Sequence, residues 1–204
     1  MPTHLVTALL SPVRWTPPGV APAAWRLAMA EDIVDLLAGL SQVDSAIVGA
    51  PADHALAAAV AWPQTAIQIR TATVGHALRA AGAAGYQAVA VLAPDVPSLP
   101  GLLVGKLLRP LTSRPVAVMP TPDGVGLAGL ACVLPPPPWL PDADLDLDLD
   151  HTSVARIRAS APSPGDVVTT PAWRRLRGPA DLSALDPALE GWDATRKLLE
   201  SSRR

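Results

Sequence analysis

A short apolar run that ends in a proline-flanked aspartate carries the clearest chemical signal in this chain. The run from Val89 reads VAVLAPDVPSLP, so Asp95 directly follows a predicted buried strand. In an open α/β sheet, the carboxyl ends of the strands open onto the ligand crevice. A carboxylate at that place can hold a divalent cation and, through the cation, a phosphate group. The alternative is that Asp95 caps the following turn or helix, because aspartate favours both positions.

Two further segments are predicted to reach the same edge of the sheet. The loop from Ser11 to Pro22 follows a predicted first strand, and TVGHAL, from Thr73, begins a predicted helix. The free backbone N–H groups of such a helix start favour an anion or the edge of a base. We therefore expect Asp95, this helix start and either Arg14 or Arg26 to face one crevice that suits a nucleotide.

Predicted strands and helices alternate along most of the chain. Strands are predicted at 4–10, 45–49, 65–69, 89–93, 115–119 and 126–134, and helices at 23–40, 52–60, 74–84 and 102–108. The first helix is expected to bury a face that includes Leu27, Ile33 and Leu37. This order predicts a three-layer α/β/α Rossmann-like fold. The turn at 122–124 is too short for a parallel crossover, so the strand after it should run antiparallel in a mixed sheet.

Composition excludes several classes of protein. Half of the 204 residues are hydrophobic and only 17% are charged, which is ample for a core. The net charge of −2 provides no basic stripe for nucleic acid. The apolar runs fall short of the ~18–20 residues that span a membrane, and the N-terminus lacks the basic start of a signal peptide. We therefore expect a cytoplasmic protein that contacts neither nucleic acid nor membrane.

The character of the chain changes after Leu134. The stretch PPPPWLP, from Pro135, is stiff, and DADLDLDLD then alternates aspartate with alanine or leucine at 142–150. This alternation indicates a solvated edge or loop, or else an acidic metal-binding face. The remaining residues provide too few large apolar groups for a core of their own. We expect residues 135–204 to extend the α/β domain at 1–134, packing on it or on a second copy, with Trp173 and Trp192 as anchors.

Four segments together carry a resemblance to a known family. The segments are VGHALRAAG from Val74, VLAPDVPSLP from Val91, PTPDGVGLAGL from Pro120 and GPADLSAL from Gly178. With them, the chain resembles the nucleotide-diphospho-sugar transferase superfamily, whose fold is of the GT-A type. Within it, the chain is similar to bacterial GT-A-like proteins of unknown function. It is more distantly similar to 2-phospholactate and molybdenum-cofactor guanylyltransferases.

The resemblance implies roles for particular residues. Asp95 stands where the superfamily keeps the aspartate that binds Mg²⁺ or Mn²⁺ and joins it to nucleotide phosphates. The helix start is implied to pack on the base or ribose through Val74, Gly75, His76 and Leu78, although His76 at such a place is also read as a half-exposed polar residue. The acceptor side is implied to be shaped by Asp123, Gly124 and Gly126.

Two departures from the family pattern bear on the activity. The loop SPVRWTPPGVAPAAWR has one glycine and no lysine, where the nucleotidyltransferases carry a glycine-rich loop with a basic residue. RRLRGPADL has arginines where the relatives tend to keep an acidic residue. One hypothesis is a metal-dependent nucleotidyl- or glycosyltransferase in which Arg14 or Arg26 supplies the missing charge. The other is a catalytically degenerate domain that binds a nucleotide, a nucleotide sugar or a protein partner.

Overall fold

The computed structural model describes residues 3–141 and 147–202, and it contains one mixed sheet in the order β3-β2-β1-β4-β6-β5-β7. The strands are β1 His4–Leu9, β2 Asp44–Gly49, β3 Ala66–Ile69, β4 Ala88–Leu92, β5 Val116–Pro120, β6 Leu127–Val133 and β7 Val167–Thr169. Of the five aspartates in the alternating stretch predicted at 142–150, those at 142, 144 and 146 lie outside the described residues.

The strand directions follow from the lengths of the connections. Strands β1 to β4 pair in parallel through helical crossovers, whereas β6 runs antiparallel to both β4 and β5. Strand β7 pairs in parallel with β5. The antiparallel strand expected after the turn at 122–124 is therefore confirmed, because so short a turn can only reverse the chain.

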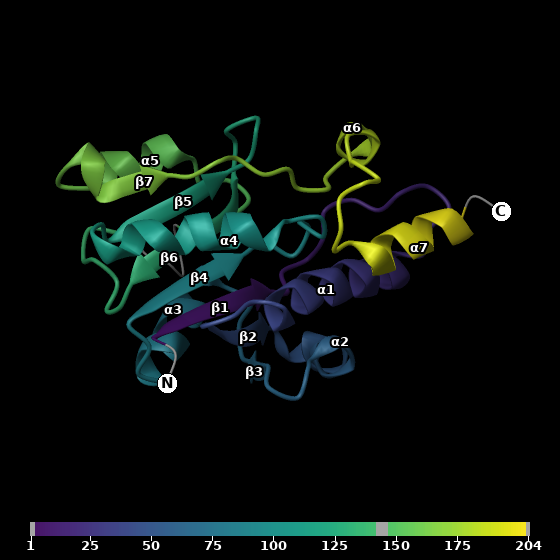
Figure 1. The fold of residues 1–204 in the computed structure, drawn as a ribbon, viewed down its shortest axis with the longest axis horizontal. Coiled ribbons are helices and arrows are strands. Elements are labelled where there is room, and N and C mark those ends of the chain that lie inside the picture. The colour runs from purple at the N-terminus through teal and green to yellow at the C-terminus, as the bar shows by residue number, and fades with distance from the viewer. Residues whose placement is uncertain (1–2, 142–146, 203–204) are drawn as a thin grey trace.

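Helices cover both faces of this sheet, which confirms the predicted three-layer α/β/α fold. Figure 1 shows α4 in front of the sheet and α3 behind β1. The helices are α1 Pro22–Ala38, α2 His54–Val60, α3 Val74–Ala83, α4 Gly101–Leu108, α5 Val154–Ser160, α6 Pro179–Ser183 and α7 Asp193–Ser201, with short 3₁₀ turns at Pro51–Asp53, Arg109–Thr112 and Pro164–Asp166. No helix of the described part is long and apolar enough to cross a membrane.

The prediction for the buried face of α1 is wrong at one residue. Ile33 and Leu37 are buried against the sheet as expected, but Leu27 is 40% exposed. Trp25 and Met29, on another side of α1, are fully buried instead. The reason is that α7 also packs along α1, so this helix buries more than one face.

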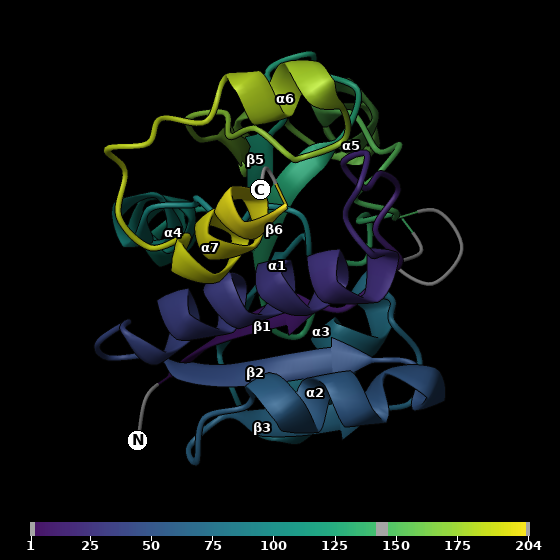
Figure 2. The same ribbon diagram turned by 90° about the vertical axis from the view of Figure 1, so that its right-hand side faces the viewer.

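Segments of the tail lie directly against the rest of the chain. Helix α7 packs along α1 in the views of Figures 1 and 2. Trp192, 5% exposed, packs with Trp25 and Met29 and donates its indole N–H to the Leu189 carbonyl at 2.9 Å. Trp173 is half-buried against the main core, and its backbone N–H donates to a carbonyl of β5 at 3.0 Å. Both tryptophans therefore contact the α/β layers.

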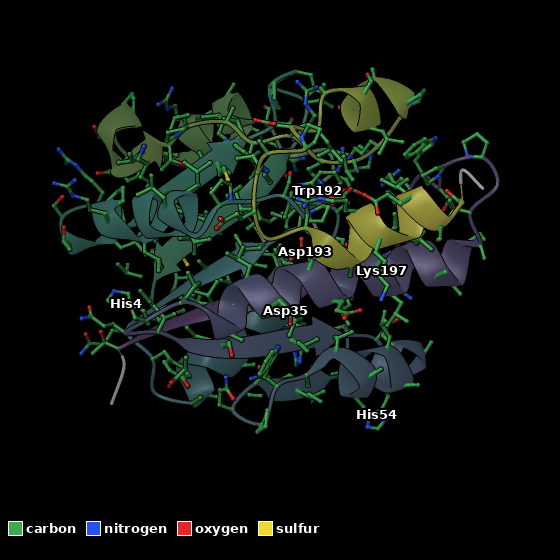
Figure 3. All side chains as sticks on the ribbon, turned by 45° about the vertical axis from the view of Figure 1, so that its right-hand side comes forward. His4, Asp35, His54, Trp192, Asp193 and Lys197 are labelled. Carbon is green, nitrogen blue, oxygen red and sulfur yellow. The ribbon has the colours of Figure 1, made fainter. Side chains whose placement is uncertain are left out.

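A buried carboxylate on α1 receives the start of α7. Asp32, 2% exposed, accepts hydrogen bonds from the backbone N–H groups of Ala194 and Thr195, each at 2.9 Å. Figure 3 shows this start of α7, marked by Trp192 and Asp193, above α1. Burial raises the pKa of Asp32 to about 6, although the hydrogen bonds from these N–H groups act to lower it.

The raised pKa of Asp32 predicts a stability that increases on mild acidification. Between the folded-state pKa of about 6 and the unfolded value, the folded protein takes up a proton that the unfolded chain does not. The free energy of unfolding should therefore rise as the pH falls through this window, by roughly 2–3 kcal/mol. Urea unfolding across this pH range measures the change. Asp32→Asn should remove the rise, and an equal pH profile in both proteins would contradict the assignment.

Candidate functional site

A cavity of about 450 Å³ opens at the carboxyl end of β1. Three segments far apart in the sequence form its walls: the loop after β1, the start of α3 and the segment at 147–150. The lining residues are Leu9, Ser11, Pro12, Arg14, Ala72, Thr73, Val74, Leu147, Asp148, Leu149 and Asp150. Apolar walls combined with an arginine suit a ligand that has both a flat apolar part and an anionic part.

Asp95 lies just beyond the end of β4 and is 1% exposed. Within the described residues, its carboxylate is hydrogen-bonded by Arg175 through Nε and by Arg177 at 3.5 Å. Its backbone carbonyl accepts the N–H of Leu176 at 2.8 Å. These partners come from the tail, some eighty residues further along the chain, rather than from the start of α4. The contacts of Asp95 are thus those of an ion-pair centre.

Arg175 ties three separate segments together beneath this carboxylate. Its side chain is 2% exposed, and Nη1 donates to the carbonyls of Leu127 at 3.1 Å and Leu149 at 3.0 Å. Its Nη2 lies 2.7 Å from Oδ1 of Asp150. A buried guanidinium with this many fixed acceptors is held in one position.

Asp150 is the second carboxylate of the cluster. It lies 2.5 Å from Nε of Arg14 and also contacts Arg175 and Arg177. Burial acts to raise the pKa of Asp150, but the charge of Arg175, the hydrogen bond from Arg14 and the charge of Arg177 outweigh it and hold the pKa below its ordinary value. Asp150 is therefore ionised at neutral pH.

The approach of Asp150 depends on Gly126, the residue immediately before β6. A Cβ at Gly126 would lie only 2.7 Å from the carbonyl oxygens of both Leu149 and Asp150. This contact lets the Leu149 carbonyl accept the N–H of Leu127 at 2.8 Å as well as a donor from Arg175. Gly126, implied by the resemblance to belong to the acceptor side, thus admits the segment that carries Asp150.

The other two residues implied on the acceptor side organise the turn between β5 and β6. Asp123 accepts hydrogen bonds from the Thr121 hydroxyl at 2.5 Å and from the Val125 N–H at 3.1 Å. The hydrogen bond with Thr121 contributes most to lowering the pKa of Asp123. Gly124 adopts φ +72°, which glycine reaches without strain. These contacts stabilise the turn itself.

The residues predicted to bind the nucleotide separate into two groups. Val74 lines the cavity, whereas Leu78 is 1% exposed in the core and Gly75 is buried and faces a different depression. The backbone N–H of His76 donates to the hydroxyl of Thr73, which caps α3. In this structure, the start of α3 therefore reaches the cavity through Thr73 and Val74.

Of the two arginines proposed to face the crevice, Arg14 lies in the cavity wall. Arg26 pairs with Asp53 at 2.8 Å and donates to the Leu10 carbonyl at 2.8 Å. Those contacts anchor the end of β1 to α1. The two arginines therefore have different roles. Of the two, Arg14 is the one that pairs with the Asp150 carboxylate at the cavity.

The carboxylates present do not fit the Mg²⁺ or Mn²⁺ that the resemblance implies. Both oxygens of Asp95 contact guanidinium nitrogens, and so does Oδ1 of Asp150. The described residues contain no group of three or more His, Cys, Asp or Glu that could hold a metal ion. A divalent cation at Asp95 would need oxygen ligands that are free of such partners.

Sequence reasoning singled out Asp95 and Arg14 but not the residues that join them. Asp150 was one of five alternating aspartates, and nothing in the alternating pattern shows which of them points toward Asp95 and the arginines. Arg175 and Arg177 were noted only because they stand where an acidic residue was expected. The signal that could have found them is charge balance, since Asp95 in a buried position requires a cation.

No model of a known protein family matches the chain, and no curated protein matches it in sequence. Solved structures do match along its whole length. A protein described as a nucleotide-diphospho-sugar transferase, from Desulfovibrio desulfuricans G20, is 20% identical with a TM-score of 0.67, and the match covers 100% of this chain and 98% of that one. The 4-diphosphocytidyl-2C-methyl-D-erythritol synthase of Anaerococcus prevotii is 10% identical with a TM-score of 0.58, covering 96% and 95%.

A third match was solved as a complex with manganese. It is Rv0371c of Mycobacterium tuberculosis H37Rv, 19% identical with a TM-score of 0.52, covering 97% of each chain. At these identities the matches establish the fold. The chain therefore has the fold of these solved structures, and the likeness to a nucleotide-diphospho-sugar transferase is the one that the resemblance in its sequence implied.

Proposed function

We propose that this chain binds a nucleotide or nucleotide sugar in the cavity at the carboxyl end of β1. The observation that carries the proposal is the position of the cavity in the fold. The chain moves outward in one direction from β1 to β2 and in the other from β1 to β4, so the β1–β4 boundary is the switch point of the sheet. Ligands of open α/β sheets bind in the crevice outside that point.

The cavity wall offers a suitable cation for a phosphate group. The side chain of Arg14 is 51% exposed, and Asp150 fixes its guanidinium through Nε. The remaining N–H donors of a guanidinium in that position match two phosphate oxygens. Leu9, Pro12 and Val74 offer an apolar surface on which a base or ribose can pack.

Binding without turnover is the function that this geometry supports best. Asp95, the residue expected to hold the metal, is engaged by Arg175 and Arg177, which favours the hypothesis of a degenerate domain. Nucleotidyl or glycosyl transfer is the second candidate, favoured by the likeness in fold to the nucleotide-diphospho-sugar transferase and the 4-diphosphocytidyl-2C-methyl-D-erythritol synthase described above. In that case Arg14 would stabilise charge on the phosphates.

A thermal-shift screen tests the proposed function. The full chain is heated with ATP, CTP, GTP, UTP and their nucleotide sugars, each in EDTA and in Mn²⁺, and the hits are titrated by calorimetry. Arg14→Gln should weaken binding about 10- to 100-fold, the usual range for a lost charge-assisted hydrogen bond. Arg109→Gln, the same change at an exposed residue just after α4, should leave the affinity unaltered. Equal affinities in both variants, or no binding by any nucleotide, would refute the proposal.

A further inference from the structure

The guanidinium of Arg175 occupies the space between two carboxylates. A guanidinium has five N–H donors. In Arg175 they meet four acceptor groups: the Asp95 carboxylate through Nε, the Asp150 carboxylate through Nη2, and the carbonyls of Leu127 and Leu149 through Nη1. These four acceptors belong to three segments of the chain, at Asp95, at Leu127 and at 149–150, and all three meet at one buried positive charge.

This cation cannot leave its place without a large cost. Its side chain is 2% exposed and Asp95 is 1% exposed, so removing it would leave a buried carboxylate without its closest partner. The two backbone carbonyls would also lose their donors. The position of Asp150 is fixed in turn by the close approach to Gly126.

The charges of this ion-pair cluster, of which Arg14 and Asp150 line the cavity, favour an anion over a second cation. Arg14, Arg175 and Arg177 face two carboxylates, Asp95 and Asp150, so the cluster carries a net charge of +1. A divalent cation would raise this to +3, whereas a phosphate group would bring it toward neutrality. Asp148, also on the cavity wall, is more than half exposed and pairs with His151 at 2.6 Å.

We propose that Arg175 takes the place of a divalent cation between Asp95 and Asp150, so that the cavity binds the phosphates of a nucleotide without metal. Arg14, which lines the cavity, is then the cation that meets the bound phosphates, while Arg177 pairs with the same Asp150 carboxylate. This inference rests on the proposed nucleotide site. It differs from that proposal in its prediction for metal, which is testable in the absence of any nucleotide.

Electron paramagnetic resonance of Mn²⁺ tests the metal part directly. Mn²⁺ is titrated into the full chain without nucleotide, and the signal of the free ion should keep the intensity it has in buffer. A loss of signal that Asp95→Asn abolishes would overturn the proposal. If the signal is lost equally in the Asp95→Asn variant, the Mn²⁺ is bound at another site. That result supports the proposal, as does an undiminished signal. If Asp95→Asn does not fold, Asp150→Asn replaces it, because Asp150 is the more exposed of the two carboxylates.

A second measurement tests the phosphate part. The affinities for inorganic pyrophosphate and for CTP are measured by calorimetry in EDTA and in Mn²⁺, and for each probe the two values should agree within about threefold, allowing for complexes of the probe with the metal itself. A loss of more than about tenfold in EDTA would overturn the proposal and leave nucleotide binding standing. If no nucleotide binds under either condition, the proposed function fails, while the Mn²⁺ titration still decides whether Arg175 excludes the metal.

Discussion

Replacing Arg175 by methionine should lower the free energy of unfolding by about 3–5 kcal/mol, the range found when one partner of a buried ion pair is removed. Methionine fills much of the volume of the arginine stem but offers no N–H donor. Asp95, 1% exposed, would lose its closest partner, and the carbonyls of Leu127 and Leu149 would each lose a donor. Urea unfolding followed by circular dichroism measures the loss.

The neighbouring arginine provides the control for this substitution. Arg174 is 41% exposed and pairs with Asp181 at 3.3 Å on the surface. Arg174→Met should therefore cost less than about 1 kcal/mol. Equal losses in the two variants would mean that Arg175 is an ordinary surface cation, and the ion-pair centre described here would be wrong.

Ending the chain after Leu134 should abolish cooperative folding. The truncation removes β7, which pairs with β5, and it removes the partners of Asp95. It also uncovers Trp25 and Met29 on α1, which α7 now buries. Burial of Trp192 alone contributes on the order of 2–3 kcal/mol by its apolar area.

Thermal unfolding and size-exclusion chromatography measure the effect of this truncation. A chain that ends at Ser202 keeps all the described residues after position 2 and serves as the control. If the chain that ends at Leu134 keeps the melting temperature and oligomeric state of the control, residues 135–204 are only an appendage. The packing of the tail would then contribute nothing to stability.

The fold could be predicted because it depends on local patterns. Alternating apolar runs and turn residues placed β1 to β6 to within one or two positions, although they did not predict β7, and the length of the turn at 122–124 fixed the direction of β6. The same patterns placed Asp95 at the end of β4. The prediction for Leu27 was wrong because periodicity shows which faces of a helix are apolar but not which later segment will cover them.

The centre of the site could not be predicted because it depends on contacts between distant segments. Arg175 and Asp95 are 80 residues apart, and Asp150 reaches them only because Gly126 lacks a side chain. A pattern of alternating aspartates carries no information about such a close approach. The arginines before Gly178 could be recognised as a departure from the family, but their partners became evident only from the structure.

Hydrogen–deuterium exchange of the full chain, with and without the nucleotide selected by the screen, tests most directly whether the cavity at the end of β1 is the binding site. Bound nucleotide should slow the exchange of peptides that cover residues 9–15, 72–76 and 147–151, which form that cavity. A second cavity of about 600 Å³ lies between α1, the start of α4 and the start of α7, and provides the comparison. Protection confined to peptides of that second cavity, or no protection at the end of β1, would contradict the account.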